Sequence, residues 1–538
     1  MDGTMMDFPL TLTPILERAG KLFPDVEIVT RLPDKSLHRY SYGEFHRRTH
    51  LLAAGLEDAG LKRGERVATI MWNSYAHLEA YFAVPCAGGV LHTLNFRLHE
   101  NDIAYIANHA EDRFLIVDDV LLPIYERIKD KVKFERVFVV SFTGAANPDG
   151  LENYEEFLAG GRTDYAFPEL DENEACAMCY TSGTTGRPKG VAYSHRAMVL
   201  HTFCAGLADT IGLTQRDVLM PVVPMFHANA WGLAHAAVMM GSKLILPGPH
   251  LDAESLLGLC DSEQVTLAAG VPTIWMGILQ ALEADSARWT LHPELRTVVG
   301  GSAVPEGMMR GFDRHGITTI HAWGMTETTP LGSVSRLKRG MENLSEDERY
   351  QARIKQGLPV PFVEVRVIND EGEAPWDGES MGELQVRGPW IAASYFNSEQ
   401  GQDKWSEDGW FGTGDVVTID KEGYIKITDR TKDLIKSGGE WISSVDLENA
   451  LMGHDSVREA AVIAVPHEKW TERPLAVVVP MEGTEPSAEE LGKYLGRDFA
   501  KWWLPDAYEF VDDIPRTSTG KFLKTALREK FAAHMWRD

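Results

Sequence analysis

Cysteine is scarce in this 538-residue chain, which contains five. Cys176 and Cys179 form a C-x-x-C pair, but no second cysteine pair or group of histidines completes a zinc site around them. Because the pair stands in an apolar run, we interpret it as part of a buried strand and not as a redox motif. The composition therefore predicts a reduced protein without a disulfide framework.

Long apolar runs are also missing, because none reaches the roughly 18 residues that a helix needs to span a bilayer. The first residues, MDGTMMDFPLTL, mix aspartates with apolar positions and lack a basic start, which argues against a signal peptide. We therefore expect a cytoplasmic protein without a transmembrane segment, and a peripheral association with the membrane stays open.

Basic residues are outnumbered, with 53 lysines and arginines against 79 aspartates and glutamates and a net charge of −26. Nucleic-acid binding needs a basic surface, so this balance argues against it. The overall field also repels phosphate, so a phosphate ligand must be held by local donors. We expect small molecules as partners and no nucleic acid.

The chain does contain short apolar runs that alternate with amphipathic, helix-like stretches such as 40–60. These runs are 66–72, 114–119, 136–141, 243–248, 266–272 and 296–302. Alternation of this kind predicts an α/β protein with mainly parallel sheets. The length is too great for one compact core and predicts two or more domains.

The pattern changes near residue 430, after which strands and helices follow one another in about 100 residues. We expect a large N-terminal domain of parallel-rich sheets flanked by helices over 1–428. A charged hinge linker over 429–434 and a small, mobile C-terminal α+β domain over 435–538 would follow.

The stretch 180–190, YTSGTTGRPKG, combines glycines and hydroxyls with a lysine. In a Walker A loop the lysine comes directly after a glycine and opens a helix, whereas here Arg187 and Pro188 intervene and a strand-like run follows. We expect a loop between two strands. Its glycines and hydroxyls either bind phosphate or form a plain surface hairpin.

Four further motifs lie downstream, at 321–330, 409–417, 429–443 and 515–524. Trp323 suits contact with a nucleobase, Thr326 and Glu327 suit a phosphate and its Mg²⁺, and Asp415 suits a ribose diol. Lys521 stands on a glycine turn near the end of the chain. The plain alternatives for the four motifs, in the same order, are an ordinary turn capped by Thr326, a turn aspartate, a solvated linker and a basic tail.

Together, in this order and over residues 40–530, these motifs resemble the adenylate-forming superfamily of acyl-CoA synthetases, peptide-synthetase adenylation domains and luciferases. The segments VVPMFHANAW, GVPTIW, HAWGMTE and IKSGGEWISSVDLENALM are most similar to bacterial medium- and long-chain fatty acyl-CoA synthetases. The resemblance implies a fatty acid–CoA ligase that uses ATP, Mg²⁺ and CoA. A carboxylate would attack the α-phosphorus of ATP to give acyl-AMP, and the CoA thiol would then take the acyl group.

The resemblance also implies roles for individual residues and a homodimer formed through the N-terminal domain. Lys521, His227, Glu327 and Thr184 match catalytic positions, and Thr184 and Glu327 match the positions associated with the metal. Asp429 matches the hinge, and the CoA positions are Gly438, Gly439 and Glu440. The nucleotide-binding positions are Thr181, Ser182, Gly183, Thr185, Gly186, Lys189, Gly301, Ser302, Ala303, Ala322, Trp323, Gly324, Met325, Thr326, Asp415, Arg430, Lys432, Lys436 and Trp441.

The acyl substrate is less closely defined. Residues 227–231, HANAW, contain no acid that could hold an amino group, which argues against amino-acid adenylation. Trp231, Gly270 and Val271 match an acyl pocket, in which Trp231 is either a gate or plain core packing. Because one methylene discriminates by only about 1–3 kcal/mol, we expect a range of chain lengths.

Three alternatives stay open. The first is a CoA ligase for short or sulfur-containing acids such as 3-methylmercaptopropionate. The others are a luciferase-like oxygenase and a non-catalytic nucleotide- or acyl-binding protein. The sequence leaves the preferred chain length, the oligomeric state and any regulation undecided.

Overall fold

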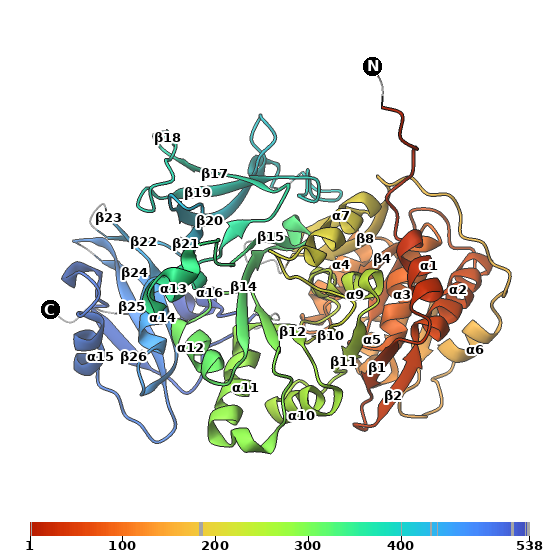
Figure 1. Ribbon diagram of the computed structural model, residues 1–538, viewed down its shortest axis with the longest axis horizontal. Coiled ribbons are helices and arrows are strands. Elements are labelled where there is room, and N and C mark those ends of the chain that lie inside the picture. Colours follow the sequence, from red (N-terminus) through yellow and green to blue (C-terminus); the bar gives the residue numbers. More distant parts are fainter. Residues whose placement is uncertain are drawn as a thin grey trace.

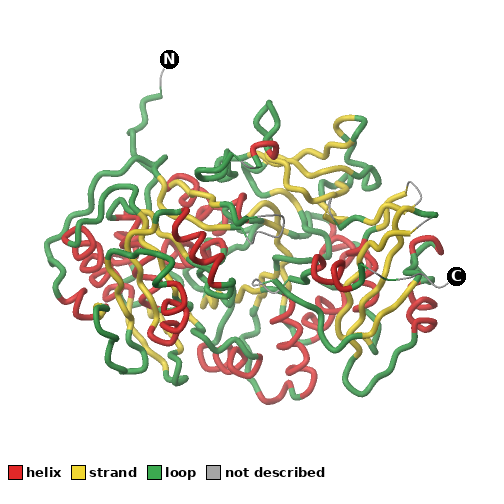
Figure 2. The backbone as a smooth tube through the Cα atoms, turned by 180° about the vertical axis from the view of Figure 1, so that it is seen from behind, coloured by secondary structure: helices red, strands yellow, loops and turns green. Residues whose placement is uncertain are grey.

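The computed structural model describes residues 1, 3–181, 187–399, 401–430, 433–437, 440–467, 469–517, 521–532 and 534 (Figure 1). Among these residues the strands form four sheets, three before residue 430 and one after it. Figure 2 shows helices packed around the strands of the N-terminal part, and the last sheet with its own helices at the opposite end. The expected α/β architecture, with a large N-terminal and a smaller C-terminal part, is confirmed.

The first sheet has seven strands in the order β7-β6-β5-β3-β4-β8-β9, and all of its pairs are parallel except β8 with β9. The strands are β3 (Arg66–Ile70), β4 (Val90–Thr93), β5 (Asp112–Asp118), β6 (Arg136–Val140), β7 (Glu152–Asn153), β8 (Ala175–Tyr180) and β9 (Gly190–Ser194). The loop after residue 180 therefore joins two strands, as predicted. Cys176 and Cys179 are buried in β8, so the buried-strand interpretation is correct.

Helices before and between these strands are α1 (Thr13–Leu22), α2 (Tyr42–Asp58), α3 (Tyr75–Cys86), α4 (Glu100–His109), α5 (Leu122–Ile128) and α6 (Tyr154–Ala159). Their starts follow local rules. The Ser41 hydroxyl accepts a hydrogen bond from the Glu44 N–H at the start of α2, and Ser74 does the same for His77 at the start of α3. The predicted helix over 40–60 corresponds to α2.

The second sheet has nine strands in the order β16-β15-β14-β13-β12-β10-β11-β1-β2. Its strands are β1 (Glu27–Arg31), β2 (Leu37–Ser41), β10 (Val218–Pro221), β11 (Lys243–Leu246), β12 (Leu267–Gly270), β13 (Arg296–Val299), β14 (Thr318–Gly324), β15 (Leu331–Val334) and β16 (Leu358–Pro359). The central strands from β1 to β14 pair in parallel. Their carboxyl ends therefore meet at one edge, which is where α/β sheets bind ligands.

The helices of this layer are α7 (His195–Gly206), α8 (Ala228–Trp231), α9 (Leu233–Met240), α10 (Ala253–Glu263), α11 (Pro272–Ala284), α12 (Glu306–Arg314) and α13 (Glu346–Arg353). Tyr42 and Phe45 of α2 pack with Leu233 of α9 in the largest apolar core, whose residues come from both large sheets. Of the described helices, none is both long and apolar enough to cross a membrane.

A third, antiparallel sheet in the order β18-β17-β19-β20-β21 leads to the end of the N-terminal part. It consists of β17 (Glu364–Asn369), β18 (Gly372–Glu373), β19 (Gly382–Arg387), β20 (Phe411–Ile419) and β21 (Ile425–Arg430). The last sheet has the order β23-β22-β25-β24, with β26 beside β25. Its elements are β22 (Ile435–Ser437), β23 (Glu440–Ile442), α14 (Ser444–Met452), β24 (Val457–His467), β25 (Thr471–Pro480), α15 (Ala488–Leu495), β26 (Ala507–Phe510) and α16 (Lys524–Lys530).

One buried ion pair joins α2 to α3. The Arg48 guanidinium contacts both carboxylate oxygens of Glu79 at 2.6 and 3.2 Å, and the Tyr154 hydroxyl donates to the same carboxylate at 2.7 Å. The Glu79 side chain has no exposed surface. Burial raises the pKa of Glu79, while Arg48 and Tyr154 favour its ionised form. Removal of the arginine would leave a buried carboxylate without its cation.

We therefore expect Arg48→Met to lower the free energy of unfolding by about 3–5 kcal/mol, because an unpaired buried charge is costly. The double variant Arg48→Met/Glu79→Leu should lose less of the free energy of unfolding than Arg48→Met does. The matched control is Arg47→Met, because Arg47 pairs with Glu44 at the surface and should contribute less than about 1 kcal/mol. Urea denaturation followed by tryptophan fluorescence measures all three, and equal losses in the Arg48 and Arg47 variants would contradict the prediction.

Candidate active site

Two adjoining cavities open at the carboxyl edge of the nine-stranded sheet. The first has a volume of about 400 Å³ and the second, between α11, α12 and the C-terminal part, about 620 Å³. Both are lined by Gly301, Trp323, Arg430 and Lys521. The site therefore brings together residues that are more than 200 positions apart in the chain.

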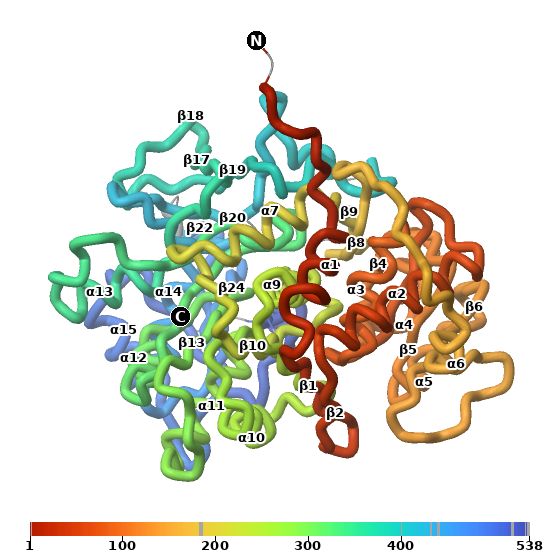
Figure 3. Tube along the Cα trace, turned by 45° about the vertical axis from the view of Figure 1, so that its right-hand side comes forward, coloured from red at the N-terminus to blue at the C-terminus, as the bar shows by residue number. Residues whose placement is uncertain are grey.

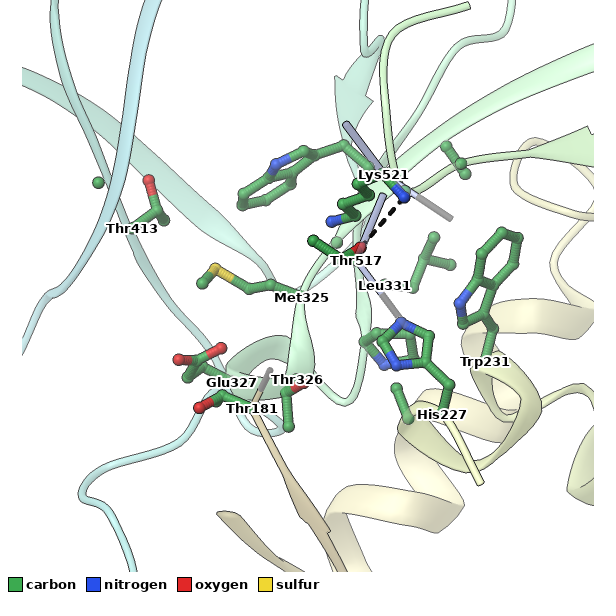
Figure 4. Close-up of a pocket in the computed structure, with 18 of the residues that line it drawn as sticks. Thr181, His227, Trp231, Met325, Thr326, Glu327, Leu331, Thr413, Thr517 and Lys521 are labelled. Carbon is green, nitrogen blue, oxygen red and sulfur yellow. Dashed lines mark hydrogen bonds between the residues drawn. The ribbon is translucent and has the colours of Figure 1, made fainter. Parts of the chain in front are cut away.

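The first cavity has an apolar end and a polar end. Trp231 and Leu331 lie at the apolar end, and Ile211 and Val298 add to the apolar lining (Figure 4). Thr181, Thr326 and Glu327 lie at the polar end, and the other polar lining residues are Arg187, Lys189, His227, Lys404, Arg430, Asp433 and Lys521. Figure 4 shows Trp231, His227 and Leu331 on one side of this cavity and Glu327, Thr326 and Thr181 on the other. Cations outnumber carboxylates here, which is the local charge needed to hold an anion in an acidic chain.

His227 stands at the start of α8. Burial, together with the positive charges of Lys521 and Arg97, lowers the pKa of His227 to about 4. The imidazole is therefore neutral near pH 7 and can donate one hydrogen bond while it accepts another. A neutral donor in this position can bind a developing oxyanion and adds no charge of its own to the site.

The turn after His227 has an uncommon backbone. Residues 228–231 all have positive φ angles, of 42°, 51°, 51° and 57°, and Gly232 follows with 72°. Left-handed conformation costs about 1–2 kcal/mol for each non-glycine residue, so neighbouring contacts must hold this turn in place. One of them is the thiol of Cys179, which donates to the Asn229 side-chain oxygen at 3.3 Å. A Cβ on Gly232 would lie 2.5 Å from the His201 ring, so only glycine fits there.

This turn places Trp231 at the inner wall of the first cavity. The indole lies close to Gly300, where an added Cβ would be 3.4 Å from the ring. Trp231 is also only partly buried, whereas the three residues before it are buried. Its position is compatible with both interpretations of this residue, a gate and core packing.

Glu327 lies in a short 3₁₀ turn after β14 and faces the polar end of the cavity. Its carboxylate accepts a hydrogen bond from the Tyr395 hydroxyl at 2.7 Å. Burial first, and then the charge of Glu327, raises the pKa of Tyr395, so this hydroxyl stays a donor. The Lys189 ammonium lies 4.9 Å from the centre of the Tyr395 ring. Tyr395 thus connects the lysine of the glycine-rich loop to the carboxylate.

Asp415 in β20 is buried beside the second cavity. One of its oxygens accepts the indole N–H of Trp323 at 2.9 Å, and the other pairs with Arg430 Nε at 2.6 Å. A carboxylate offers about four acceptor positions, so this one retains acceptor capacity for a ligand diol. The indole takes part in the site through its N–H as well as its ring face.

Lys521 follows β26 and lies on a turn in which the Thr517 N–H donates to the Lys521 carbonyl at 2.7 Å. The Lys521 N–H in turn donates to the Thr517 hydroxyl at 3.1 Å, which Figure 4 marks with a dashed line. An added Cβ on Gly301 would lie 3.7 Å from Lys521 Cε. The C-terminal part therefore delivers Lys521 to the cavity of the N-terminal part.

Asp429 lies immediately before the C-terminal part and is buried. One carboxylate oxygen accepts the N–H and the hydroxyl of Ser444 at 2.7 and 2.6 Å, at the start of α14. Burial raises the pKa of Asp429, although Lys524 and Ser444 favour its ionised form. Lys524 also contacts the buried Glu448 at 2.6 Å. A small charged cluster thus surrounds the expected hinge.

Most of the described residues that the sequence singled out lie at the two cavities. Thr181, Lys189, Met325, Thr326 and Glu327 line the first, Ser302, Ala303 and Asp415 line the second, and Ala322 and Gly324 line both. Val271 packs beside Gly301, but neither Gly270 nor Val271 lines either cavity. Lys436 is exposed on β22 and also lies outside both.

Several predicted positions fall outside the described residues, namely Ser182, Gly183, Thr184, Thr185, Gly186, Lys432, Gly438 and Gly439. For Glu440 and Trp441 the structure describes the backbone of β23 alone. Their predicted roles stay predictions. Conversely, the sequence alone did not assign Tyr395 and Lys404 to the site, because nothing in the local sequence connects them to the glycine-rich loop or to Glu327. Arg187 stands in that loop but was not assigned a role.

Comparison with known proteins agrees with this geometry. Residues 16–396 match the family described as AMP-binding enzyme, and residues 446–521 match the AMP-binding enzyme C-terminal domain. A "Long-chain-fatty-acid--CoA ligase" of Thermus thermophilus is 51% identical over 532 residues, which cover 98% of this chain and 97% of the relative. A "3-methylmercaptopropionyl-CoA ligase" of Ruegeria pomeroyi is 46% identical over 538 residues, which cover 99% of both.

A solved structure shows the same fold. The ATP-bound MatB of Rhodopseudomonas palustris superposes with a TM-score of 0.82 at 27% identity, covering 98% of this chain and 99% of that one. With both parts of the chain matched, and with two relatives aligned almost from end to end, the protein is a member of the AMP-binding enzyme family.

Proposed function

We propose that the protein is an ATP-dependent fatty acid–CoA ligase that forms acyl-AMP and pyrophosphate, and then acyl-CoA and AMP. The observation that carries this proposal is the two-ended first cavity. Its apolar end meets its polar end at His227 and Lys521, and it opens to the second cavity beside Trp323. A carboxylate with an apolar chain and a nucleoside phosphate have complementary surfaces in this arrangement.

In the first half-reaction the acyl carboxylate attacks the α-phosphorus of ATP. The Lys521 ammonium neutralises the charge that develops there, and the neutral His227 donates a hydrogen bond to an oxygen of the reacting groups. Trp323 stacks on the adenine, and Asp415 accepts from the ribose hydroxyls. Lys189 and the loop after Thr181 hold the departing pyrophosphate.

Mg²⁺ fits this site because Glu327 presents a carboxylate, the hard oxygen ligand that Mg²⁺ prefers. The Tyr395 hydroxyl occupies one of its oxygens and orients the group. Thr184 would be a further ligand. When bound, the ion neutralises phosphate charge and so makes pyrophosphate a better leaving group.

The second half-reaction requires a different face of the C-terminal domain. We place the hinge at 429–434, which begins with the last two residues of β21 and ends before β22. Rotation about Asp429 withdraws Lys521 and brings the face that carries residues 436–440 to the site for reaction with the CoA thiol. The exposure of Lys436 outside both cavities agrees with a role that begins only after this rotation. A cytoplasmic location and a homodimer stay predictions.

The acyl group is a medium- to long-chain fatty acid in this proposal. Burial of each CH₂ contributes about 0.8 kcal/mol, so an alkyl chain gains affinity by contact with Trp231, Leu331 and the other apolar residues that line the cavity. The second candidate is a short sulfur-containing acid, favoured by the Ruegeria relative at 46% identity.

A substrate panel distinguishes these candidates. We expect CoA-thioester formation to increase from propionate towards medium and long chains, because each added methylene buries more apolar surface. The panel includes methylthio and aryl acids and is measured by mass spectrometry of the acyl-CoA products. A maximum at 3-methylmercaptopropionate would favour the second candidate. Light emission or O₂ uptake without thioester would contradict the ligase.

Lys521→Ala should reduce acid-dependent ATP–pyrophosphate exchange by about 10²–10³-fold, because a preorganised charge donor is lost. Thioester formation from supplied acyl-AMP should be spared. The control is Lys530→Ala in the same region, since Lys530 is exposed on α16 and contacts the Phe531 ring. Equal losses in both half-reactions would show that the two steps do not use alternate faces of the domain.

Trp231→Ala should broaden or shift the chain-length profile while the KM for ATP changes little, because the indole borders the apolar end of the cavity. The control is Trp376→Ala, because Trp376 is 42% exposed and lines neither cavity. Thioester formation is measured for each acid of the panel with both variants. An unchanged profile for Trp231→Ala would leave core packing as the role of this residue.

A further inference from the structure

On the outer side of the N-terminal part α1 runs beside α2 (Figure 3), and three side chains of types that can ligate a metal lie together there. Glu17 comes from α1, and His46 and His50 stand one helical turn apart on α2. Their ligand atoms lie within 4.8 Å of one another, and no other such group of three occurs in the described part of the chain. None of the three residues lines either cavity of the candidate active site.

Both histidines contact the same carboxylate oxygen of Glu17. Glu17 Oε1 lies 3.0 Å from His46 Nε2 and also 3.0 Å from His50 Nε2. Two donors on one tetrahedral Zn²⁺ ion, each about 2.05 Å from the metal, are about 3.4 Å apart. The two nitrogen–oxygen distances of 3.0 Å are therefore within a few tenths of an ångström of the spacing of two ligands on one ion.

The His50 ring is held so that one nitrogen faces Glu17. His50 Nδ1 lies 3.3 Å from the Tyr165 carbonyl oxygen, and Nε2, on the other side of the ring, lies 3.0 Å from Glu17 Oε1. A hydrogen bond from Nδ1 to a carbonyl is the usual way in which a metal-binding histidine is oriented.

The surroundings hold the ligands in place. The second oxygen of Glu17 pairs with Lys21 at 2.8 Å, and the His50 ring packs 4.4 Å from the Phe167 ring. An added Cβ on Gly20 would lie 2.5 Å from the His46 ring, so the glycine lets this ring lie against α1. Burial opposes ionisation of Glu17, but hydrogen bonds from Lys21, His46 and His50 lower its pKa to about 2.

From this geometry we propose that Glu17, His46 and His50 bind one divalent transition-metal ion, with Zn²⁺ as the fitting ion. Imidazole nitrogens suit zinc and its neighbours, whereas Mg²⁺ and Ca²⁺ prefer oxygen ligands. The side chains of the three residues are 20–27% exposed, so an ion can enter from solvent and a water can complete its coordination. The ion ties α1 to α2, and α1 in turn contacts α9 through the Arg18 bond to the Met239 carbonyl at 3.2 Å.

The test uses the full-length chain without a histidine tag, treated with EDTA and exchanged into buffer that contains excess Mg²⁺. Zn²⁺ is titrated in competition with a chromogenic chelator. We expect one ion per chain. In the variant His46→Gln/His50→Gln the affinity for Zn²⁺ should fall strongly. Loss of a residue that only orients a metal ligand costs about 10–100-fold in affinity, and loss of two ligands should cost more. Zn²⁺ should raise the Tm of the wild type and leave that of this variant unchanged.

The matched control is His99→Gln/His292→Gln, which also removes two histidines. His99 and His292 each accept a local backbone N–H, from Asn101 and Glu294. This control should bind Zn²⁺ as the wild type does. The buried cysteines are not expected to compete in the folded chain.

A second measurement needs no variant. Co²⁺ added to the stripped wild-type protein should give the visible d–d absorption of a four-coordinate ion, and Zn²⁺ should displace it. If the stripped protein takes up neither ion, or if His46→Gln/His50→Gln takes up as much as the wild type, the proposal is wrong. The two histidines and Glu17 would then be joined by hydrogen bonds alone, without a metal ion.

Discussion

The buried carboxylate of Asp415 is the interaction on which the geometry of the site depends. It receives the indole N–H of Trp323 from the end of β14 and the guanidinium of Arg430 from the end of β21. Asp415 thus connects the nine-stranded sheet, the antiparallel sheet and the segment that leads into the C-terminal part. A buried carboxylate needs such partners, because an unpaired charge in the interior is strongly destabilising. The same pairing that satisfies the carboxylate also fixes the wall of the second cavity.

A second constraint is the left-handed turn over 228–231. Four non-glycine residues in this conformation require compensation from the surrounding contacts, and the turn packs between β8 and α9 to obtain it. The turn positions His227 and Trp231 on the same side of the first cavity (Figure 4). Strained backbone of this kind is expected where the fold must direct side chains that a regular helix would direct elsewhere.

The charged side chains of the first cavity are mainly positive, although the molecule as a whole is negative. The chain carries a net charge of −26, yet Arg187 and Lys189 from the glycine-rich loop and Lys521 from the C-terminal part reach one cavity. An acidic surface repels anions in general, so binding is restricted to the place where these cations converge. The neutral state of His227 fits this arrangement, because burial and the nearby cations both disfavour its protonation.

The sequence by itself determined the family and the α/β class, and most of the described residues that it singled out line the two cavities. These features depend on local motifs that can be read along the chain. The sequence also indicated that the glycine-rich loop joins two strands, since the run that follows the loop is strand-like and forms β9. Only the tertiary structure decided that Tyr395 contacts Glu327, that Trp323 donates to Asp415, and that residues 228–231 turn left-handed. It likewise placed Glu17 against His46 and His50, which belong to different helices. Such contacts join residues far apart in the chain, and their geometry follows from packing that no local pattern records.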